Sequence, residues 1–205
     1  MLVVHKKKMK EYLIPSTYID FDNENVSAKA AQLSAGIQGE LSIVEACYKF
    51  VRDEIRHSWD YKCNPVTCKA SDALKYRTGF CYSKSHLLAA LLRANGIPAG
   101  LCYQRLSVGD SGAPYCLHGL NAVFLESHGW YRCDARGNKS NVNAQFIPPD
   151  EVLAFPIREP EEFDLQGIWA TPLPVVTEAL ERYSDVTEVH ANLPDIDENE
   201  SEPQY

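Results

Sequence analysis

No stretch of the 205-residue sequence approaches the roughly 20 consecutive apolar residues that a helix needs to cross a bilayer. The N-terminal residues also lack the features of a secretory signal. Only Leu2, Val3 and Val4 precede a cluster of lysines, and no small-residue cleavage site follows. We therefore expect a chain that resides in the cytoplasm and has no membrane partner.

Positive charge is scarce as well. The chain has 20 lysines and arginines against 28 aspartates and glutamates, which gives a formal net charge of −8. Binding to a nucleic-acid backbone relies on a basic face that neutralises phosphates and releases their counterions. Nucleic acid is therefore not an expected partner.

The cysteines do not form the pattern of a disulfide framework. There are seven, an odd number, scattered singly between Cys47 and Cys133, and a reducing compartment would keep them as thiols. Cys63, Cys68 and Cys81 could be combined with His86 into a zinc site, but their spacing is looser than in the usual zinc motifs. We expect neither a metal nor another cofactor.

The excess of acid is confined to the end of the chain. Residues 178–205 contain nine acidic residues against Arg182 alone, whereas the rest of the sequence has 19 residues of each sign. The final residues combine carboxylates with almost no aliphatic side chains, which is typical of disorder. We predict a single domain over residues 1–183 and an acidic, disordered tail over residues 184–205.

Four helices are predicted in the first half of the chain. They cover about residues 25–35, 42–57, 71–76 and a longer segment that follows Thr78 and Gly79 and ends at Asn95–Gly96. Ser42 and Glu45 fit a capping box at the start of the second helix. The fourth helix is nearly encircled by leucines and alanines, so we place it in the core.

The periodicity changes after this helix. Residues 99–106, 117–125 and 130–135 are short, rich in β-forming residues and bounded by turn residues, which predicts three strands. Helices followed by strands predict an α+β domain in which the core helix packs on an antiparallel sheet. A short helix is expected near residues 175–183.

Cys81 stands at the first turn of the predicted core helix. Exposed backbone N–H groups and the positive end of the helix dipole favour an anion there, and such a position lowers the pKa of a thiol. A thiolate at this position would be a nucleophile, and its own N–H could bind the oxyanion of a tetrahedral intermediate. The alternative is a buried, inert cysteine that packs as a small hydrophobic residue.

A nucleophilic cysteine needs a base and a third group that orients the base, and His118 and Asp134 are candidates for these roles. They lie at the same end of a predicted hairpin. A two-residue turn would place them on opposite faces, whereas a three-residue loop over 126–128 would place them diagonally on one face. We therefore predict a three-residue loop or a bulge.

These residues and their surroundings resemble the transglutaminase-like superfamily. The resemblance is carried by Thr78–Cys81, by the apolar run that follows, by His118–Val123 and by Gly129–Asp134, and it extends from about Tyr12 to Pro174. It implies a papain-like catalytic domain with Cys81 as nucleophile, His118 as general base and acid, and Asp134 as the orienting group.

The superfamily includes transglutaminases, peptide N-glycanases and bacterial cysteine peptidases, all of which form a thioester acyl-enzyme from an amide. The resemblance therefore implies a peptide or protein substrate that offers a backbone amide or a glutamine side chain. We expect hydrolysis, because water is present at about 55 M, whereas transfer to an amine needs a dedicated acceptor pocket. The alternatives are protein-glutamine gamma-glutamyl transfer and a catalytically silent peptide-binding module.

Three further residues are candidates for substrate contact. Trp59 could line the substrate groove and His57 could touch the substrate, although a helix end with an anchoring tryptophan would account for both without a role in binding. Gln104 could offer a side-chain N–H to the oxyanion, depending on the face of its strand. Calcium dependence is not expected, because no acidic loop with the spacing of calcium ligands is present. The oligomeric state is left open.

Overall fold

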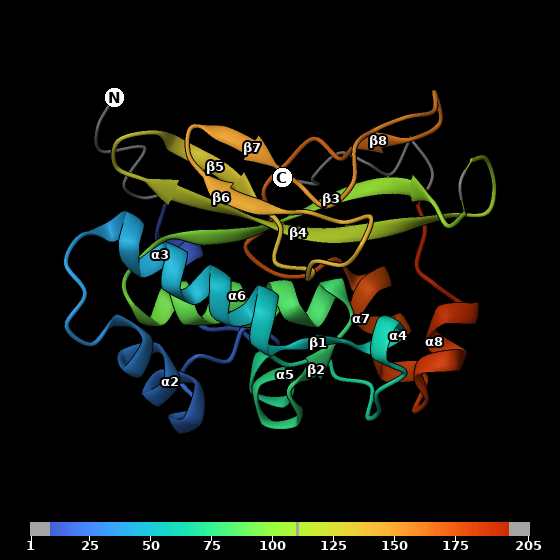
Figure 1. The fold of residues 1–205 in the computed structure, drawn as a ribbon. Coiled ribbons are helices and arrows are strands. Elements are labelled where there is room, and N and C mark those ends of the chain that lie inside the picture. Colours follow the sequence, from blue (N-terminus) through green and yellow to red (C-terminus); the bar gives the residue numbers. More distant parts are fainter. Residues whose placement is uncertain (1–8, 110, 197–205) are drawn as a thin grey trace.

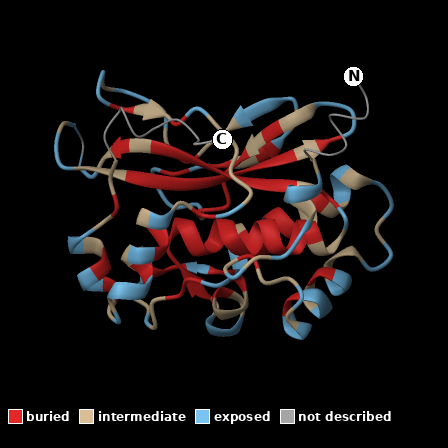
Figure 2. Ribbon diagram, turned by 180° about the vertical axis from the view of Figure 1, so that it is seen from behind, coloured by how far each residue is buried: buried red, intermediate tan, exposed pale blue. Residues whose placement is uncertain are grey.

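The computed structural model describes residues 9–109 and 111–196 and is built around one buried helix, α6 (Cys81–Ala94). An antiparallel sheet covers one side of α6, and α2 (Glu24–Ser34), α3 (Glu40–Lys49) and α5 (Ala70–Tyr76) pack against it from other directions (Figure 1). Nearly every residue of α6 is buried (Figure 2). A helix that is apolar on all sides has to lie in the core, as its sequence predicts.

The main sheet has the strand order β5-β4-β3-β8. It consists of β3 (Ala99–Ser107), β4 (Tyr115–Leu125), β5 (Gly129–Cys133) and the short β8 (Phe163–Asp164). Leu125 pairs with Gly129, so the loop between β4 and β5 is the predicted three-residue loop over 126–128. The α+β class, with a core helix on an antiparallel sheet, is confirmed.

Smaller elements complete the fold. The remaining described elements are the 3-10 turn η1 (Lys10–Leu13), the π turn η2 (Phe50–Glu54), β1 (Arg56–His57), α4 (Ser58–Tyr61), β2 (Thr78–Gly79), β6 (Gln145–Ile147), β7 (Asp150–Val152), α7 (Pro174–Arg182) and α8 (Val186–Ala191). Strands β1 and β2 pair in parallel beside the start of α6. None of the helices in the described ranges has the length and apolar character that a bilayer crossing requires.

The prediction for the second helix is wrong at both ends. Helix α3 begins at Glu40 after Gly39, so Ser42 and Glu45 lie inside the helix rather than in a capping box. Gly39 has a φ of 88°, a conformation that glycine adopts readily. The helix therefore begins directly after Gly39, earlier than a capping box at Ser42 predicts. At the other end, the chain widens into η2 and then becomes extended in β1.

The predicted boundary of the disordered tail also differs from the structure. Residues 186–191 form α8, in which Val186 and Val189 are buried. These two valines, three positions apart, place apolar side chains on one face of a short helix, and the many carboxylates around them hide this pattern in the composition. Residues 197–205 of the predicted tail lie outside the described residues.

Candidate active site

Cys81 is the first residue of α6, where backbone N–H groups lack intrahelical partners. Phe80 precedes it without a side-chain cap, so the positive end of the helix dipole faces the thiol directly. A further donor comes from β4, because the N–H of Gly119 lies 3.4 Å from Cys81 Sγ. The thiol is therefore surrounded by groups that stabilise a negative charge on sulfur.

At Gly119, β4 also approaches α6 closely. A methyl group at this position would lie 3.0 Å from Tyr82 Cδ1 and 3.3 Å from Tyr82 Cα. We expect Gly119→Ala to push the start of α6 away from β4, which would lower the free energy of unfolding by about 1–3 kcal/mol. It would also slow the reaction of Cys81 with iodoacetamide. Urea unfolding and peptide mass mapping measure the two effects.

A matched control for this substitution is Gly109→Ala. Gly109 lies in the loop after β3 that borders the cavity, and a methyl group there would meet none of the described atoms within 4 Å. We expect it to leave both the unfolding free energy and the alkylation rate of Cys81 unchanged. A Gly119→Ala protein that matches this control would contradict the close packing of β4 on α6.

His118 lies between the thiol and a buried carboxylate. Its Nε2 is 2.7 Å from Asp134 Oδ2, which leaves Nδ1 free of the carboxylate, and the neighbouring Cys81 is among the groups that raise the pKa of the ring. All three residues are buried, with Cys81 7% exposed, His118 5% and Asp134 0%. The structure thus brings together the three residues that the sequence singled out, in the order thiol, imidazole, carboxylate.

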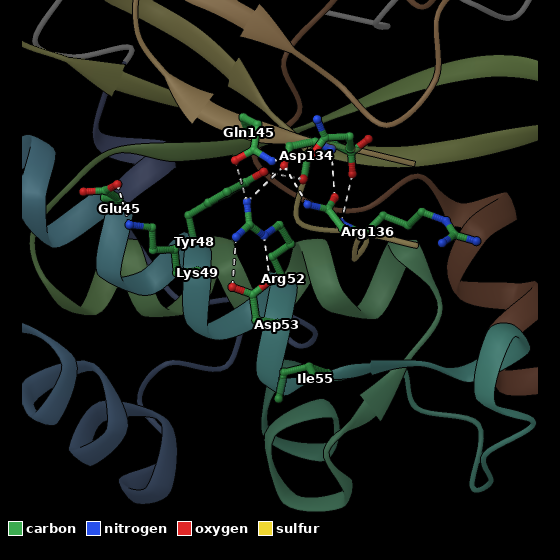
Figure 3. A network of polar contacts seen from close by, with 12 residues as sticks. Glu45, Tyr48, Lys49, Arg52, Asp53, Ile55, Asp134, Arg136 and Gln145 are labelled. Atoms are coloured by element: carbon green, nitrogen blue, oxygen red, sulfur yellow. Dashed lines mark hydrogen bonds and ion pairs between the residues drawn. The ribbon is translucent and has the colours of Figure 1, made fainter. Parts of the chain in front are cut away.

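Asp134 is fixed by hydrogen bonds from several segments. Its carboxylate accepts from the backbone N–H groups of Arg136 and Ala154, each at 3.0 Å, and its backbone oxygen accepts from the Tyr48 hydroxyl at 3.0 Å (Figure 3). Burial raises the pKa of Asp134, but the charge of His118 and these hydrogen bonds outweigh burial and lower it. Asp134 is therefore an anion that orients His118.

The site opens into a cavity of about 340 Å³. Cys81 and His118 lie in its wall, and Asp134 stays behind them, out of contact with the cavity. The rest of the lining includes the apolar residues Phe80, Leu106 and Phe155, the cations Arg136, Lys139 and Arg158, and the acidic residue Glu162. A substrate can therefore reach the sulfur and the imidazole while the carboxylate remains shielded from water.

The model of the transglutaminase-like superfamily matches residues 27–135, a range that ends one residue after Asp134. The chain belongs to this superfamily. Among solved structures, the fold is similar to that of a candidate cysteine protease from Cytophaga hutchinsonii, with a TM-score of 0.52 and 22% identity over 63% of this chain and 42% of the other. No curated protein matches the sequence.

Two further solved structures align less closely. The periplasmic domain of TgpA from Pseudomonas aeruginosa gives a TM-score of 0.46 and 22% identity, over 61% of this chain and 45% of the other. A candidate protease from Parabacteroides distasonis gives 0.42 and 12%, over 73% of this chain and 30% of the other. The alignments span less than half the length of these three structures.

The charge state of His118 follows from its two neighbours, Asp134 and Cys81. Burial lowers the pKa of His118, but the negative charges of Asp134 and Cys81 and the hydrogen bonds to them outweigh burial and raise the pKa to about 10. The imidazole is therefore protonated at neutral pH and forms an ion pair with Asp134.

This raised pKa predicts a pH dependence of stability. The stabilisation from protonated His118 is complete below the ordinary histidine pKa of about 6.5 and is lost as the pH rises through about 10. We expect the difference in unfolding free energy between wild type and His118→Ala to shrink over this window. Urea unfolding of both proteins between pH 6 and 10 measures it, and a constant difference would contradict the shift.

Arg136 connects the site to α4. Its side chain binds both carboxylate oxygens of Asp60, at 2.6 and 3.1 Å, and Lys139 binds the same carboxylate at 2.9 Å. Burial raises the pKa of Asp60, but the hydrogen bond from Arg136 and the charge of His57 outweigh it and lower the pKa to about 2. This link has no signature in the sequence, because α4 and the residues that follow β5 are more than 70 positions apart.

His57 and Trp59, two candidates for substrate contact, both line the cavity. His57 Nδ1 is buried, has no hydrogen-bond partner among the residues that the structure describes, and lies 3.6 Å from Asp60 Oδ2. Burial, and then the charge of Arg136, hold the pKa of His57 well below its ordinary value. Trp59 stacks on His190 of α8, with ring centroids 3.4 Å apart.

Gln104, the third candidate, is not brought to the cavity. Its backbone pairs with that of His118 in the sheet, but its Nε2 donates to Asp164 Oδ1 at 3.1 Å. That hydrogen bond engages the amide N–H that an oxyanion would need. The donors beside Cys81 Sγ are instead backbone groups of α6 and Gly119, for which a sequence has no residue signature.

Lys84 is a buried cation one turn along α6 from Cys81. Its Nζ donates to the backbone oxygens of Arg52 and Ile55, where η2 ends and β1 begins. Burial, and then the charge of Arg136, lower the pKa of Lys84 to about 7. Lys84 thus holds the segment that leads to His57 against α6.

The cysteines considered for zinc are not arranged as ligands. His86 Nδ1 lies 2.7 Å from the backbone oxygen of Cys68, and burial lowers the pKa of this histidine to about 4. Within residues 9–109 and 111–196, no three histidine, cysteine or acidic side chains gather into a possible metal site. His86 therefore has a packing role in the core.

Proposed function

We propose that this member of the transglutaminase-like superfamily is a thiol hydrolase that cleaves amide bonds through Cys81, His118 and Asp134. The observation that carries the proposal is the connected series of contacts at the cavity wall. The N–H of Gly119 donates to the sulfur of Cys81, and the imidazole of His118 lies beside this sulfur. Asp134 binds the far side of the imidazole at 2.7 Å. This arrangement supplies a nucleophile, a proton carrier and an orienting anion.

In the proposed first step, the Cys81 thiolate attacks the carbonyl carbon of an amide in the cavity. The resulting oxyanion would accept from the N–H of Cys81 at the start of α6, which has no acceptor within the helix. His118 then gives its proton to the leaving nitrogen as the C–N bond breaks. An amine leaves and a thioester remains on Cys81.

In the second step, neutral His118 takes a proton from water, and the water oxygen attacks the thioester carbonyl. Collapse of this second intermediate releases a carboxylic acid and regenerates the thiolate and the imidazolium. Asp134 stays ionised throughout, because it is buried among the N–H donors of Arg136 and Ala154. Water is the better acceptor at its concentration of about 55 M, unless an amine is bound specifically.

The test combines two readouts on one peptide library that is rich in glutamine. Release of new peptide termini or of ammonia reports hydrolysis, and capture of a fluorescent primary amine reports acyl transfer. We expect release without capture, and Cys81→Ala should abolish it. Amine capture at matched rates would favour a gamma-glutamyltransferase. Absence of both, together with a slow reaction of Cys81 with iodoacetamide, would favour a peptide-binding module without turnover.

A further inference from the structure

The edge of β4 next to Cys81 is only partly covered by β5. The pairing of β5 with β4 extends from Leu125 to Asn121, so residues 115–120 have no β5 partner. Gly119 and Leu117 are two positions apart and direct their N–H groups to this same edge, about 7 Å from one another. Gly119 donates to Cys81 Sγ at 3.4 Å, and Leu117 donates to the backbone oxygen of Pro194 at 2.7 Å.

Pro194 belongs to residues 193–196, which we call the C-terminal strap. The strap follows α8 and binds beside the cavity through its backbone and its side chains. Leu193 lines the cavity, and the carboxylate of Asp195 accepts two hydrogen bonds from Arg105, at 2.8 and 2.7 Å. Leu193 and Asp195 are two positions apart, the spacing at which side chains of an extended segment point the same way.

We propose that the edge of β4 at Leu117, together with Arg105, is a peptide subsite next to Cys81 and that the strap occupies it. The subsite would take an extended peptide with an aliphatic residue and, two positions later, a carboxylate. This inference rests on the proposed function, since it names the substrate class of that site. Binding an extended chain to a free strand edge is a general mode of peptide recognition.

Two properties of the site support an acidic peptide as its ligand. Arg158 is exposed and lines the cavity, whereas the carboxylate of Glu162 in the same wall already accepts from the backbone N–H groups of Ser107, Arg158 and Glu159. The carboxylate of an incoming peptide would therefore meet cations in this wall, whereas the carboxylate of Glu162 is already engaged in hydrogen bonds. Like-charge repulsion from Glu162 is correspondingly weakened.

The strap contacts the core, because Leu193 and Ile196 pack against it and Pro194 is buried, but it is held less firmly than α8. Helix α8 anchors the segment through buried Val186 and Val189, and Asn64 binds Asp185 at its start. The side chain of Asp195, in contrast, is 33% exposed, and its ion pair with Arg105 lies near the surface. The Arg105 side chain is only 14% exposed, but salt weakens an ion pair whose carboxylate is partly exposed, so another peptide carboxylate can replace that of Asp195.

The test measures peptide binding to a Cys81→Ser chain, in which no turnover occurs. The probe is a fluorescein-labelled peptide Asn-Leu-Pro-Asp-Ile, the sequence of residues 192–196, followed by fluorescence anisotropy. We expect Asp195→Asn in the protein to tighten binding about fivefold, because the chain's own strap then competes less well. Glu188→Gln, an exposed change of the same charge on α8, should leave the Kd unchanged.

A second peptide, with asparagine in place of the aspartate, tests the charge preference. We expect it to bind about fivefold more weakly to the Asp195→Asn protein. Arg105→Gln should remove this difference, and Arg105→Lys, which keeps the charge, should restore part of it. The partial rescue separates a lost charge from a disturbed fold.

Equal affinities for the two peptides, or no binding of either to the Asp195→Asn protein, would overturn the subsite. These outcomes do not depend on catalysis, because the protein carries serine at position 81. Failure of the proposed function would instead appear as a Cys81 without enhanced reactivity, in a protein that still binds the acidic peptide. The two inferences therefore fail in different experiments.

Discussion

In the His118→Ala variant, alkylation of Cys81 by iodoacetamide at pH 6.5 is expected to slow by up to about 100-fold. A thiol reacts as its thiolate, which is only about 1% of an ordinary thiol at that pH, and the variant lacks the imidazolium that favours the anion. Amide hydrolysis would fall by about 10²–10⁴-fold, because His118 also carries the proton. Peptide mass mapping measures the rate at Cys81 against those of the other six cysteines.

His128→Ala is the matched control for this experiment. His128 lies in the exposed loop at the far end of the β4–β5 hairpin and contacts Ser127 through its Nδ1. Its removal should leave the reactivity of Cys81 unchanged. If wild-type Cys81 already reacts no faster than a surface thiol, the ion pair is not formed in the free protein and the proposed mechanism does not hold.

Asp134→Ala is expected to lower the free energy of unfolding by about 3–5 kcal/mol. The substitution removes a fully buried carboxylate and leaves a protonated imidazole and two backbone N–H groups without their acceptor. Urea unfolding at pH 7 measures the loss. Asp134→Asn keeps the size of the side chain and one acceptor oxygen, so its loss should be smaller, about 1–3 kcal/mol.

Asp22→Ala provides the comparison for these variants. Asp22 is exposed, and its replacement should change the unfolding free energy by no more than about 0.5 kcal/mol. If Asp134→Ala does not fold, Asp134→Asn still tests the prediction. A loss below about 1 kcal/mol for Asp134→Ala would show that the carboxylate does not stabilise a protonated His118.

Acid should weaken the same interaction. The pKa of Asp134 is lowered in the folded protein, so the stability it contributes is present above the ordinary carboxyl value and is lost as the pH falls below it. The pair of His118 and Asp134 therefore has an acid limit set by Asp134 and an alkaline limit, about pH 10, set by His118. Both groups keep their charges across the neutral range.

The local pattern of the sequence was sufficient for the parts of the site that depend on regular elements. The leucines and alanines that nearly encircle the second half of α6 predicted its place in the core, and Thr78 and Gly79 before Cys81 marked the start of the helix. The three-residue loop over 126–128 fixed which residues of β4 and β5 share a face, and so brought Asp134 to His118. Periodicity and loop length determine these relations within one helix or one hairpin.

Contacts between distant segments were decided only by the tertiary structure. The N–H of Gly119 reaches Cys81 Sγ, and Arg136 reaches Asp60, because separate elements pack at particular distances and angles. Gln104 is turned to Asp164 for the same reason. Residues 184–196 are likewise ordered because Val186 is buried against the domain and Asp195 forms an ion pair with Arg105. The acidic composition of the segment reveals neither contact. A sequence carries the pattern of each element, whereas the complementarity of two surfaces arises only when both have folded.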